Sequence, residues 1–199
     1  MVLGVTGCPG SGKSVLAGFI AENGWELVDA DDLGHEVVEG NSGVLRELVD
    51  TFGADICDST GKLNRKLLAH RAFADSARTR LLNDIVHPAL ITCLKSRINE
   101  ISSKGSNVVV SCALIFEWRI EDLFDCVVCM HAHERLRKKR IMERDGRTSD
   151  EIDGLFAAQL PESEKIRKAD IVIANNGSIE NLKVFGTMLS ELPRYADTV

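Results

Sequence analysis

The sequence has 199 residues, of which 44% are hydrophobic and 27% are charged, and its formal net charge is −6. This composition is typical of an ordinary globular chain with enough apolar residues for a sizeable core. The acidic balance argues against general nucleic-acid binding, and no apolar run approaches the length that a membrane span needs.

The first predicted element is a short apolar strand over Val2–Thr6, and a glycine-rich segment follows it. Gly7 to Ser14 has the sequence Gly-Cys-Pro-Gly-Ser-Gly-Lys-Ser, which fits the phosphate-loop pattern G-x-x-x-x-G-K-S/T at every fixed position. A helix is predicted directly after it, over Val15–Ala21. In such loops glycines let backbone N–H groups point at phosphate oxygens, and the helix N-terminus adds partial positive charge.

The loop therefore predicts a nucleotide site with a bound cation. Lys13 is expected to reach the β- and γ-phosphates, and the Ser14 hydroxyl is expected to ligate Mg²⁺. The alternative is a glycine-rich turn that matches by chance, and the flanking strand and helix argue against it. The residues predicted to bind the nucleotide here are Gly10, Ser11, Gly12, Lys13, Ser14 and Val15.

Other short apolar runs alternate with helical stretches along the chain. Such runs, with helices between them, predict an α/β fold with a parallel sheet covered on both faces. No linker or internal repeat divides the chain. The further predicted strands are Glu26–Asp29, Asn107–Ser111, Cys126–Met130 and Ile171–Ala174.

A long region between the second and third strands contains no convincing strand. Helices inserted there are a natural place for a substrate-binding subdomain. His87-Pro88 is predicted to mark the start of a new helix, since proline is tolerated at a first helical position. The predicted helices are Leu33–Glu39, Gly43–Phe52, Arg65–Phe73, Ala77–Asp84 and Pro88–Ser103.

The second strand ends at Asp29, and two more aspartates, Asp31 and Asp32, follow it closely. The carboxyl ends of parallel strands share the edge that carries the phosphate loop, so Asp29 and Asp31 should face the γ-phosphate. A carboxylate there can accept a proton from an attacking hydroxyl, or hold Mg²⁺ or its water. Asp32 is predicted to cap the next helix. For Asp31 a catalytic role is favoured over capping because of the edge that it occupies.

The segment from His133 to Lys168 is predicted to be a helical pair with a turn at Asp145-Gly146, and Thr148 and Glu151 should form a capping box. Its first part is strongly basic. Arg137, Arg140 and Arg144 are spaced three and four apart and share a helix face. A charge run can be a solvated face. Phosphoryl transfer, however, needs positive side chains around the transferring group, which a mobile basic helix would supply.

Four more residues are candidates from their position alone. His87 could bind substrate or fill a polar niche, and its spacing favours the niche. Phe116 and Glu117 lie just past the third strand and could touch the acceptor, with core packing as the competing interpretation for Phe116. Asn175 lies in a turn after the last strand, where it could contact a nucleotide base.

The six cysteines are scattered and mostly lie in apolar runs, which favours a cytoplasmic protein with free thiols. No secretion signal is evident before the first strand. Cys126 and Cys129 have redox-motif spacing, but on a strand they should point to opposite faces. Cys8 lies in the phosphate loop, and we hypothesise that thiol reagents can modify it unless nucleotide is bound.

Together these residues resemble the dephospho-CoA kinase family, whose members are phosphate-loop kinases of the nucleoside-monophosphate kinase type. The resemblance spans nearly the whole chain. The residues that narrow it are Asp29-Ala30-Asp31, His87-Pro88 and Phe116-Glu117, in this order. Further matching elements are Gly7–Ser14, Arg144-Asp145-Gly146, Gln159 with Pro161, Lys168-Ala169-Asp170 and Asn175-Asn176-Gly177-Ser178.

The resemblance implies a single domain over residues 1–199 with five parallel strands in the order 2-3-1-4-5. The core would comprise residues 1–32, 105–132 and 169–199. A helical CoA-binding insertion would span 33–104, and a lid would span 133–168.

The implied reaction converts ATP and 3′-dephospho-CoA into ADP and CoA. By resemblance, Asp31 is the base for the ribose 3′-hydroxyl, and Lys13, Arg140 and Arg144 stabilise the phosphoryl charge. Mg²⁺ would sit on Ser14. Both substrates are small molecules, and we expect a monomer or weak homo-oligomer with no nucleic-acid or membrane partner. The implied substrate contacts are Asp29, His87, Phe116 and Glu117, and Asn175 would contact ATP.

The chain also departs from the family pattern. Ser111 and Ala113 stand where the family usually has Asp and Pro, and Ile91 and Leu155 stand where Arg is common. Two alternatives therefore stay open: another nucleoside or nucleoside-monophosphate kinase of the same fold, and a nucleotide-binding paralogue with little catalysis. No Asn-Lys-x-Asp guanine motif appears, which argues against a GTPase switch.

Overall fold

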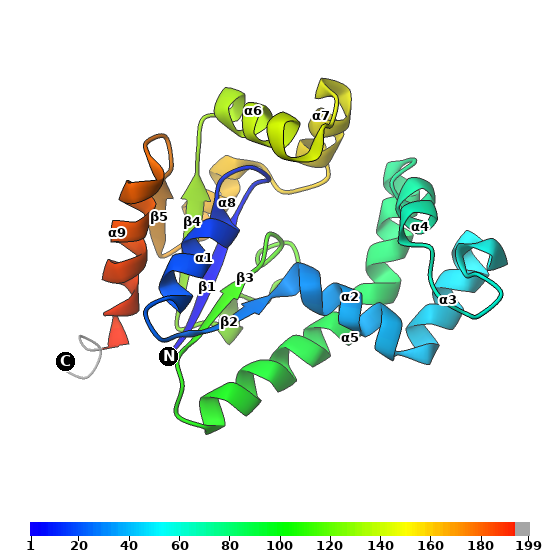
Figure 1. Ribbon diagram of the computed structural model, residues 1–199, viewed down its shortest axis with the longest axis horizontal. Coiled ribbons are helices and arrows are strands. Elements are labelled where there is room, and N and C mark those ends of the chain that lie inside the picture. Colours follow the sequence, from blue (N-terminus) through cyan, green and yellow to red (C-terminus); the bar gives the residue numbers. More distant parts are fainter. Residues whose placement is uncertain (194–199) are drawn as a thin grey trace. The chain divides into compact units, whose positions relative to one another are not determined.

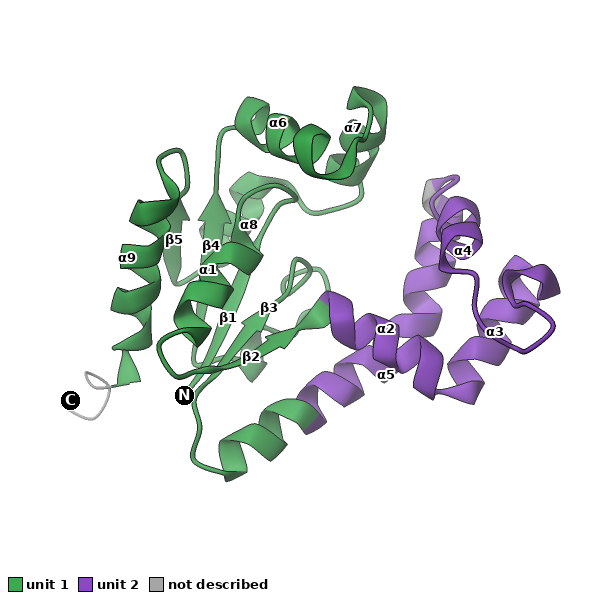
Figure 2. Ribbon diagram, in the orientation of Figure 1, with its two compact units in different colours: residues 1–30, 97–199 green, residues 31–96 purple. Residues whose placement is uncertain are grey.

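The computed structural model describes residues 1–193 (Figure 1), so residues 194–199 of the predicted core segment lie outside it. The chain forms two compact units (Figure 2). One comprises residues 1–30 and 97–199, and the other comprises residues 31–96. Within residues 1–193, no helix combines the length and the apolar character that crossing a membrane requires.

The first unit is built on a five-stranded sheet. Every neighbouring pair of strands is parallel, and the spatial order is β2-β3-β1-β4-β5. This confirms the predicted order, and each predicted strand is found within one residue of its expected ends. The strands are β1 (Val2–Gly7), β2 (Glu26–Asp29), β3 (Val108–Ser111), β4 (Cys126–His131) and β5 (Ile171–Ala174).

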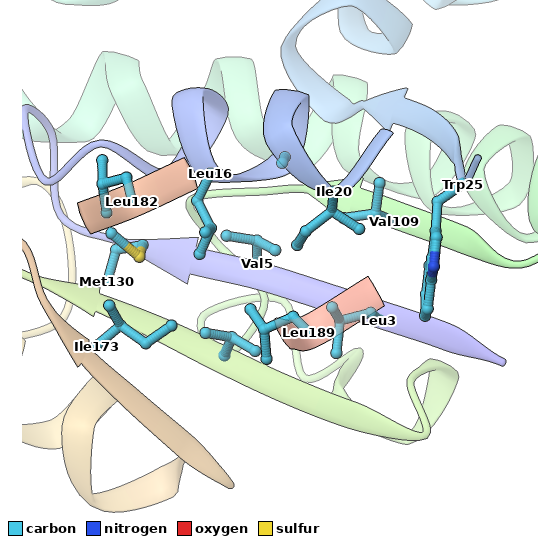
Figure 3. Close-up of a cluster of buried hydrophobic side chains, with 12 residues drawn as sticks. Leu3, Val5, Leu16, Ile20, Trp25, Val109, Met130, Ile173, Leu182 and Leu189 are labelled. Atoms are coloured by element: carbon cyan, nitrogen blue, oxygen red, sulfur yellow. The ribbon is translucent and has the colours of Figure 1, made fainter. Parts of the chain in front are cut away.

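Helices α1 (Lys13–Ala21) and α9 (Ile179–Ser190) pack against each other over one face of the sheet (Figure 1). Figure 3 shows the core between them and the strands. Leu3 and Val5 of β1 are two residues apart and point to the same face, and Leu16 and Ile20 of α1 are four apart. All four side chains are fully buried. Residues two apart on the strand and four apart on the helix therefore pack into the same core.

The second unit is helical, with α2 (Ala30–Gly40), α3 (Ser42–Phe52), α4 (Arg65–Ala72) and the first part of α5 (Ser76–Ser103). Asn41 and Asn64 cap α3 and α4, since each side chain accepts hydrogen bonds from the first turn of its helix. The unit has an apolar core of its own. Its buried residues include Val44, Leu48, Phe52, Ile56, Leu68 and Ala72.

Pro88 lies inside α5 and does not start a new helix, so that prediction is wrong. Proline removes one N–H donor from the ladder. The helix continues because its buried face runs on beyond the proline, with Leu90, Leu94 and Ile98 at four-residue spacing. The Thr92 hydroxyl donates a hydrogen bond of 2.8 Å to the Pro88 carbonyl and supports the turn after it.

The segment after β4 contains three helices rather than the predicted pair: α6 (Glu134–Asp145), α7 (Ser149–Ala157) and α8 (Glu162–Lys168). The predicted capping box of Thr148 and Glu151 is confirmed at the start of α7. The sequence analysis did not predict the break between α7 and α8, which lies before Pro161. Proline disfavours the helical conformation in the residue that precedes it, so α7 ends and α8 begins after the proline.

The predicted cap at Asp32 is also wrong. Helix α2 begins at Ala30, so Asp31 and Asp32 both lie in its first turn. Carboxylates in a first turn interact favourably with the partial positive charge of the helix N-terminus. Asp32 therefore contributes from within the helix rather than from its cap position.

Replacing a core residue between α1 and the sheet should destabilise the protein. Leu16→Ala removes a fully buried side chain and should lower the free energy of unfolding by about 2–5 kcal/mol, because it leaves a cavity. Chemical denaturation measures this loss. Val184→Ala on α9, at 59% exposure, is the matched control, and an equal loss in both variants would contradict this description of the core.

Candidate active site

The phosphate loop connects β1 to α1, and three of its glycines, Gly7, Gly10 and Gly12, have a positive φ. Gly10 has φ 77° and Gly12 has φ 98°, a region that L-residues other than glycine rarely adopt. The Ser11 N–H donates to the Cys8 carbonyl at 3.1 Å, which tightens the turn. Helix α1 begins directly after it at Lys13, so its first N–H groups have no partner within the helix and are available to an anion.

Gly12 leaves no room for a side chain. A Cβ atom at this position would lie 2.3 Å from Nδ2 of Asn175. That amide donates a hydrogen bond of 2.8 Å to the Ser11 carbonyl, and the Asn175 side chain is buried. The turn after β5 therefore holds the phosphate loop through Asn175.

Arg140 of α6 joins the same cluster. Its Nη1 donates to the Gly10 carbonyl at 3.3 Å, and its Nη2 donates to the Asn175 carbonyl at 3.1 Å. The structure thus brings together three of the regions predicted from sequence: the phosphate loop, the turn at Asn175 and the basic helix.

Arg137 is a residue whose role the sequence analysis missed, although it was placed on the same helix face. Its side chain is buried, its Nε donates to the Ala132 carbonyl at 3.0 Å, and its guanidinium lies 4.4 Å from the centre of the Phe156 ring. A Cβ on Gly10 would lie 2.7 Å from the Arg137 carbonyl oxygen, so α6 packs directly against the loop.

Arg144 lies in a different environment. Its side chain is 71% exposed, and its guanidinium donates two hydrogen bonds to Asp145, of 2.6 and 2.8 Å. This pairing holds the pKa of the Asp145 carboxyl below its usual value. Lys138 and Lys139 pair with acidic residues one turn away on α6. The basic helix therefore has one face against the phosphate loop and another that is solvated.

Ser14 and Ser111 meet at the carboxyl edge of the sheet. Their hydroxyl oxygens are 3.3 Å apart, and Ser111 is the register partner of Asp29 on the neighbouring strand. Hydroxyl and carboxylate oxygens suit a hard cation such as Mg²⁺, which takes one or two protein groups and fills its shell with water and phosphate. Among residues 1–193 there is no group of three or more His, Cys, Asp or Glu side chains that could hold a metal ion.

Phe116 and Glu117 are held by the protein itself. The Phe116 side chain is 3% exposed, and its ring lies under the Lys168 ammonium at 5.6 Å. Oε1 of Glu117 lies 2.8 Å from Nζ of Lys165 and accepts a 2.9 Å hydrogen bond from the Leu160 N–H. The predicted contact of these two residues with the acceptor stays a prediction.

Asp31 and His87 belong to the helical unit. Asp31 is exposed in the first turn of α2, and His87 lies within α5. Burial lowers the pKa of the His87 imidazole, and the nearby Asp84 carboxylate opposes this only in part. His87 is therefore a neutral side chain near physiological pH.

Two buried thiols near the loop, those of Cys8 and Cys129, have pKa values above the ordinary value of a cysteine. Cys8 is 7% exposed, and burial raises the pKa of its thiol, although the charges of Lys165 and Arg137 oppose the shift. Burial also raises the pKa of the Cys129 thiol to about 12. All six cysteines are free thiols, as the sequence predicted.

Comparison with known proteins gives a consistent result. The family model described as dephospho-CoA kinase (CoaE) matches residues 1–181. The dephospho-CoA kinase of Corynebacterium glutamicum is 36% identical over 181 residues, which cover 90% of each chain. Among solved structures, the TT1252 protein of Thermus thermophilus has a TM-score of 0.78 at 30% identity, covering 96% of this chain and 97% of that one.

A further solved structure, a dephospho-CoA kinase from Campylobacter jejuni, has a TM-score of 0.65 at 22% identity and covers 94% of each chain. At this identity the likeness shows the fold. The phosphate-loop kinase architecture that the motif predicted is therefore confirmed.

The glycine at position 12 can be tested directly. Gly12→Ala places a Cβ against Asn175 at a left-handed φ, which should cost about 1–3 kcal/mol in backbone strain and displace the Asn175 amide. We expect ATP affinity to fall by roughly 10- to 100-fold in isothermal titration calorimetry. Gly18→Ala on α1, where no other atom lies within 4 Å of the new Cβ, is the control and should bind ATP normally.

Because the pKa of the Cys8 thiol is raised, its alkylation should depend on pH and be slow near neutral pH. At pH 7–8 the thiol stays protonated, and only the thiolate is nucleophilic. Iodoacetamide should therefore label the partly exposed Cys57 and Cys93 before Cys8, and Cys8 labelling should rise only as the pH passes 9.0. Peptide mass mapping measures this order. Rapid labelling of Cys8 at pH 7 would show that the loop opens in solution.

Proposed function

Because this chain belongs to the dephospho-CoA kinase family, we propose roles for its residues in that reaction, with Asp31 as the general base. The protein is a kinase that transfers a phosphoryl group from ATP to the ribose 3′-hydroxyl of dephospho-CoA. The product is CoA, and this is the final step of CoA biosynthesis. The alternatives of another nucleotide kinase and of a non-catalytic paralogue have no comparable support.

The conformation of the phosphate loop is the observation that supports the proposed ATP site. We propose that the N–H groups between Gly10 and Val15 bind the phosphate oxygens, while Lys13 reaches the β- and γ-phosphates. Arg140 and Asn175 support this role because they bond to the Gly10 and Ser11 carbonyls. A loop fixed in this way pays little reorganisation free energy when the anion binds.

The proton of the attacking 3′-hydroxyl goes to Asp31 in this proposal. Asp31 comes two residues after Asp29, the last residue of β2, on the edge that carries the phosphate loop. The negative charge that develops on the transferring phosphoryl group is stabilised by Lys13 and by the arginines of the lid segment, Arg140 and Arg144. Transfer to the hydroxyl oxygen then releases ADP.

We propose Ser14 as the protein ligand of Mg²⁺. The neighbouring Ser111 hydroxyl, and the Asp29 carboxylate at the register position beside it, supply the oxygen-rich surroundings that support this assignment. When bound, Mg²⁺ neutralises charge on the phosphates and orients them. The protein groups named here position the ion and its water shell.

The helical unit of residues 31–96 is proposed to bind the CoA moiety, with the helices of 133–168 as a lid over ATP. Asp29, His87, Phe116 and Glu117 are the proposed contacts on the acceptor side. The free thiols support a cytoplasmic location. We expect a monomer or weak homo-oligomer with small-molecule substrates.

The base assignment has a direct test. Asp31→Asn keeps the size and the place of the side chain in the first turn of α2 but removes its ability to accept the proton. We expect turnover on dephospho-CoA to fall by about 10²- to 10⁴-fold, the usual contribution of a general base, while the Kd of ATP stays nearly unchanged. A coupled ADP-release assay and calorimetry measure the two quantities.

Asp32→Asn is the matched control because it removes the neighbouring carboxylate from the same helical turn. Its turnover should stay close to that of the unmodified enzyme. Near-normal turnover in Asp31→Asn, or an equal loss of turnover in both variants, would contradict the assignment of Asp31 as the general base.

A further inference from the structure

Lys165 of α8 is a fully buried lysine, and its charge is completely matched. The Nζ atom lies 2.6 Å from the Ala113 carbonyl, 2.8 Å from Oε1 of Glu117 and 3.1 Å from Oε1 of Gln159. The Ala113 and Gln159 oxygens accept hydrogen bonds from the ammonium group, and the Glu117 carboxylate forms an ion pair with it. Such a complete shell is what a buried charge needs to avoid a large desolvation penalty.

The three oxygens come from two separate segments of the chain. Ala113 and Glu117 belong to the segment that follows β3, and Gln159 lies in the connection between α7 and α8. The same connection is tied a second time, because the Leu160 N–H donates to the Glu117 carboxylate at 2.9 Å. Lys165 therefore fixes the end of the lid segment against the segment after β3.

The Ala113 carbonyl extends this link to the phosphate loop. It also accepts a hydrogen bond of 3.1 Å from the hydroxyl of Thr6, the residue before Gly7 on β1. Two residues earlier than Ala113, Ser111 meets the Ser14 hydroxyl. The lysine thus shares an acceptor with the strand that leads into the loop.

We propose that Lys165 is a positioning residue for phosphoryl transfer: it sets where the lid segment stands relative to the phosphate loop. Arg140 and the backbone of Arg137 hold the α6 end of that segment against the loop, and Lys165 holds the α8 end. The inference rests on the proposed role of the lid arginines. Displacing catalytic groups by about 1 Å can cost on the order of 10²-fold in rate.

The test separates positioning from stability. Lys165→Met leaves the Glu117 carboxylate buried without its cation, so it should lower the melting temperature. It should also lower kcat/KM for ATP by roughly 10- to 100-fold. The KM for dephospho-CoA should stay within about twofold, because the proposed lid acts on ATP. The double variant Lys165→Met/Glu117→Gln removes the unpaired charge but keeps an acceptor for the Leu160 N–H, and it should regain most of the melting temperature.

The kinetics of the double variant decide the question. A recovered melting temperature with kcat/KM for ATP still low supports positioning by Lys165. Kinetics that recover together with the melting temperature would overturn it and leave Lys165 a purely structural residue. If Lys165→Met alone fails to fold, the double variant still allows the kinetics to be measured without Lys165.

Two single variants complete the experiment. Arg167→Met removes an exposed positive charge from the same helix and should leave kcat/KM for ATP unchanged. Glu117→Gln keeps the acceptor for Lys165, so its loss should be smaller than that of Lys165→Met. If Glu117→Gln alone lowers kcat/KM for ATP as much as the double variant does, the loss belongs to Glu117 and the positioning role of Lys165 is overturned. The Asp31→Asn measurement is independent of these variants, so failure of either idea is recognised separately.

Discussion

A phosphate loop turns its N–H groups toward the anion, so its carbonyl groups face the protein and need donors of their own. Here the donors come from far along the chain. Arg140, 130 residues after Gly10, bonds to the Gly10 carbonyl, and Asn175, 164 residues after Ser11, bonds to the Ser11 carbonyl. The sheet order makes this possible, because β4 lies beside β1 and β5 lies beside β4. The segments that follow these two strands begin at the same edge as the loop and reach it directly. The fold is thus organised so that its C-terminal half completes a loop made by its first residues.

The phosphate loop, the five strands and their parallel arrangement follow from the sequence because each rests on a local pattern: a fixed motif or an apolar run bounded by polar residues. Breaks within helical regions were harder to place. Pro88 and Pro161 carry the same local signal, yet α5 continues through the first and a new helix starts at the second. Buried apolar residues at four-residue spacing sustain α5 beyond Pro88, whereas the residues after Pro161 are mostly charged. Proline disrupts both helices locally, and tertiary packing decides whether the helix survives.

Helix α8 shows why part of the site could not be predicted. Its sequence, Glu-Ser-Glu-Lys-Ile-Arg-Lys, has the alternating charge that is typical of a solvated helix. Two of these residues, Glu162 and Lys165, lie three apart on one face and turn inward. Glu162 lies 2.9 Å from Nδ1 of His131 and 3.5 Å from Nε of Arg137, while Lys165 pairs with Glu117. The inward face of this helix is charged rather than apolar, so no hydropathy pattern reveals it. Buried pairs of this kind are costly to form, and they become favourable only where the surrounding oxygens and cations are already in place.

Arg140 and Arg144, the two predicted catalytic arginines, differ in the interactions that would be lost if their side chains moved. Arg140 donates hydrogen bonds to the backbone carbonyls of Gly10 and Asn175, so displacing it would take this donor away from both carbonyls. Arg144 lies in the continuous exposed run 142–151, and its guanidinium donates two hydrogen bonds to its neighbour Asp145. An exposed ion pair contributes about 0–1 kcal/mol, a small barrier compared with what a phosphate can offer an arginine. The proposed lid therefore has one arginine that is fixed against the phosphate loop and another that is exposed and paired with its neighbour. In the proposed reaction, Arg140 keeps the phosphate loop ordered before ATP arrives, and the contact of Arg144 with the phosphates forms after ATP has bound.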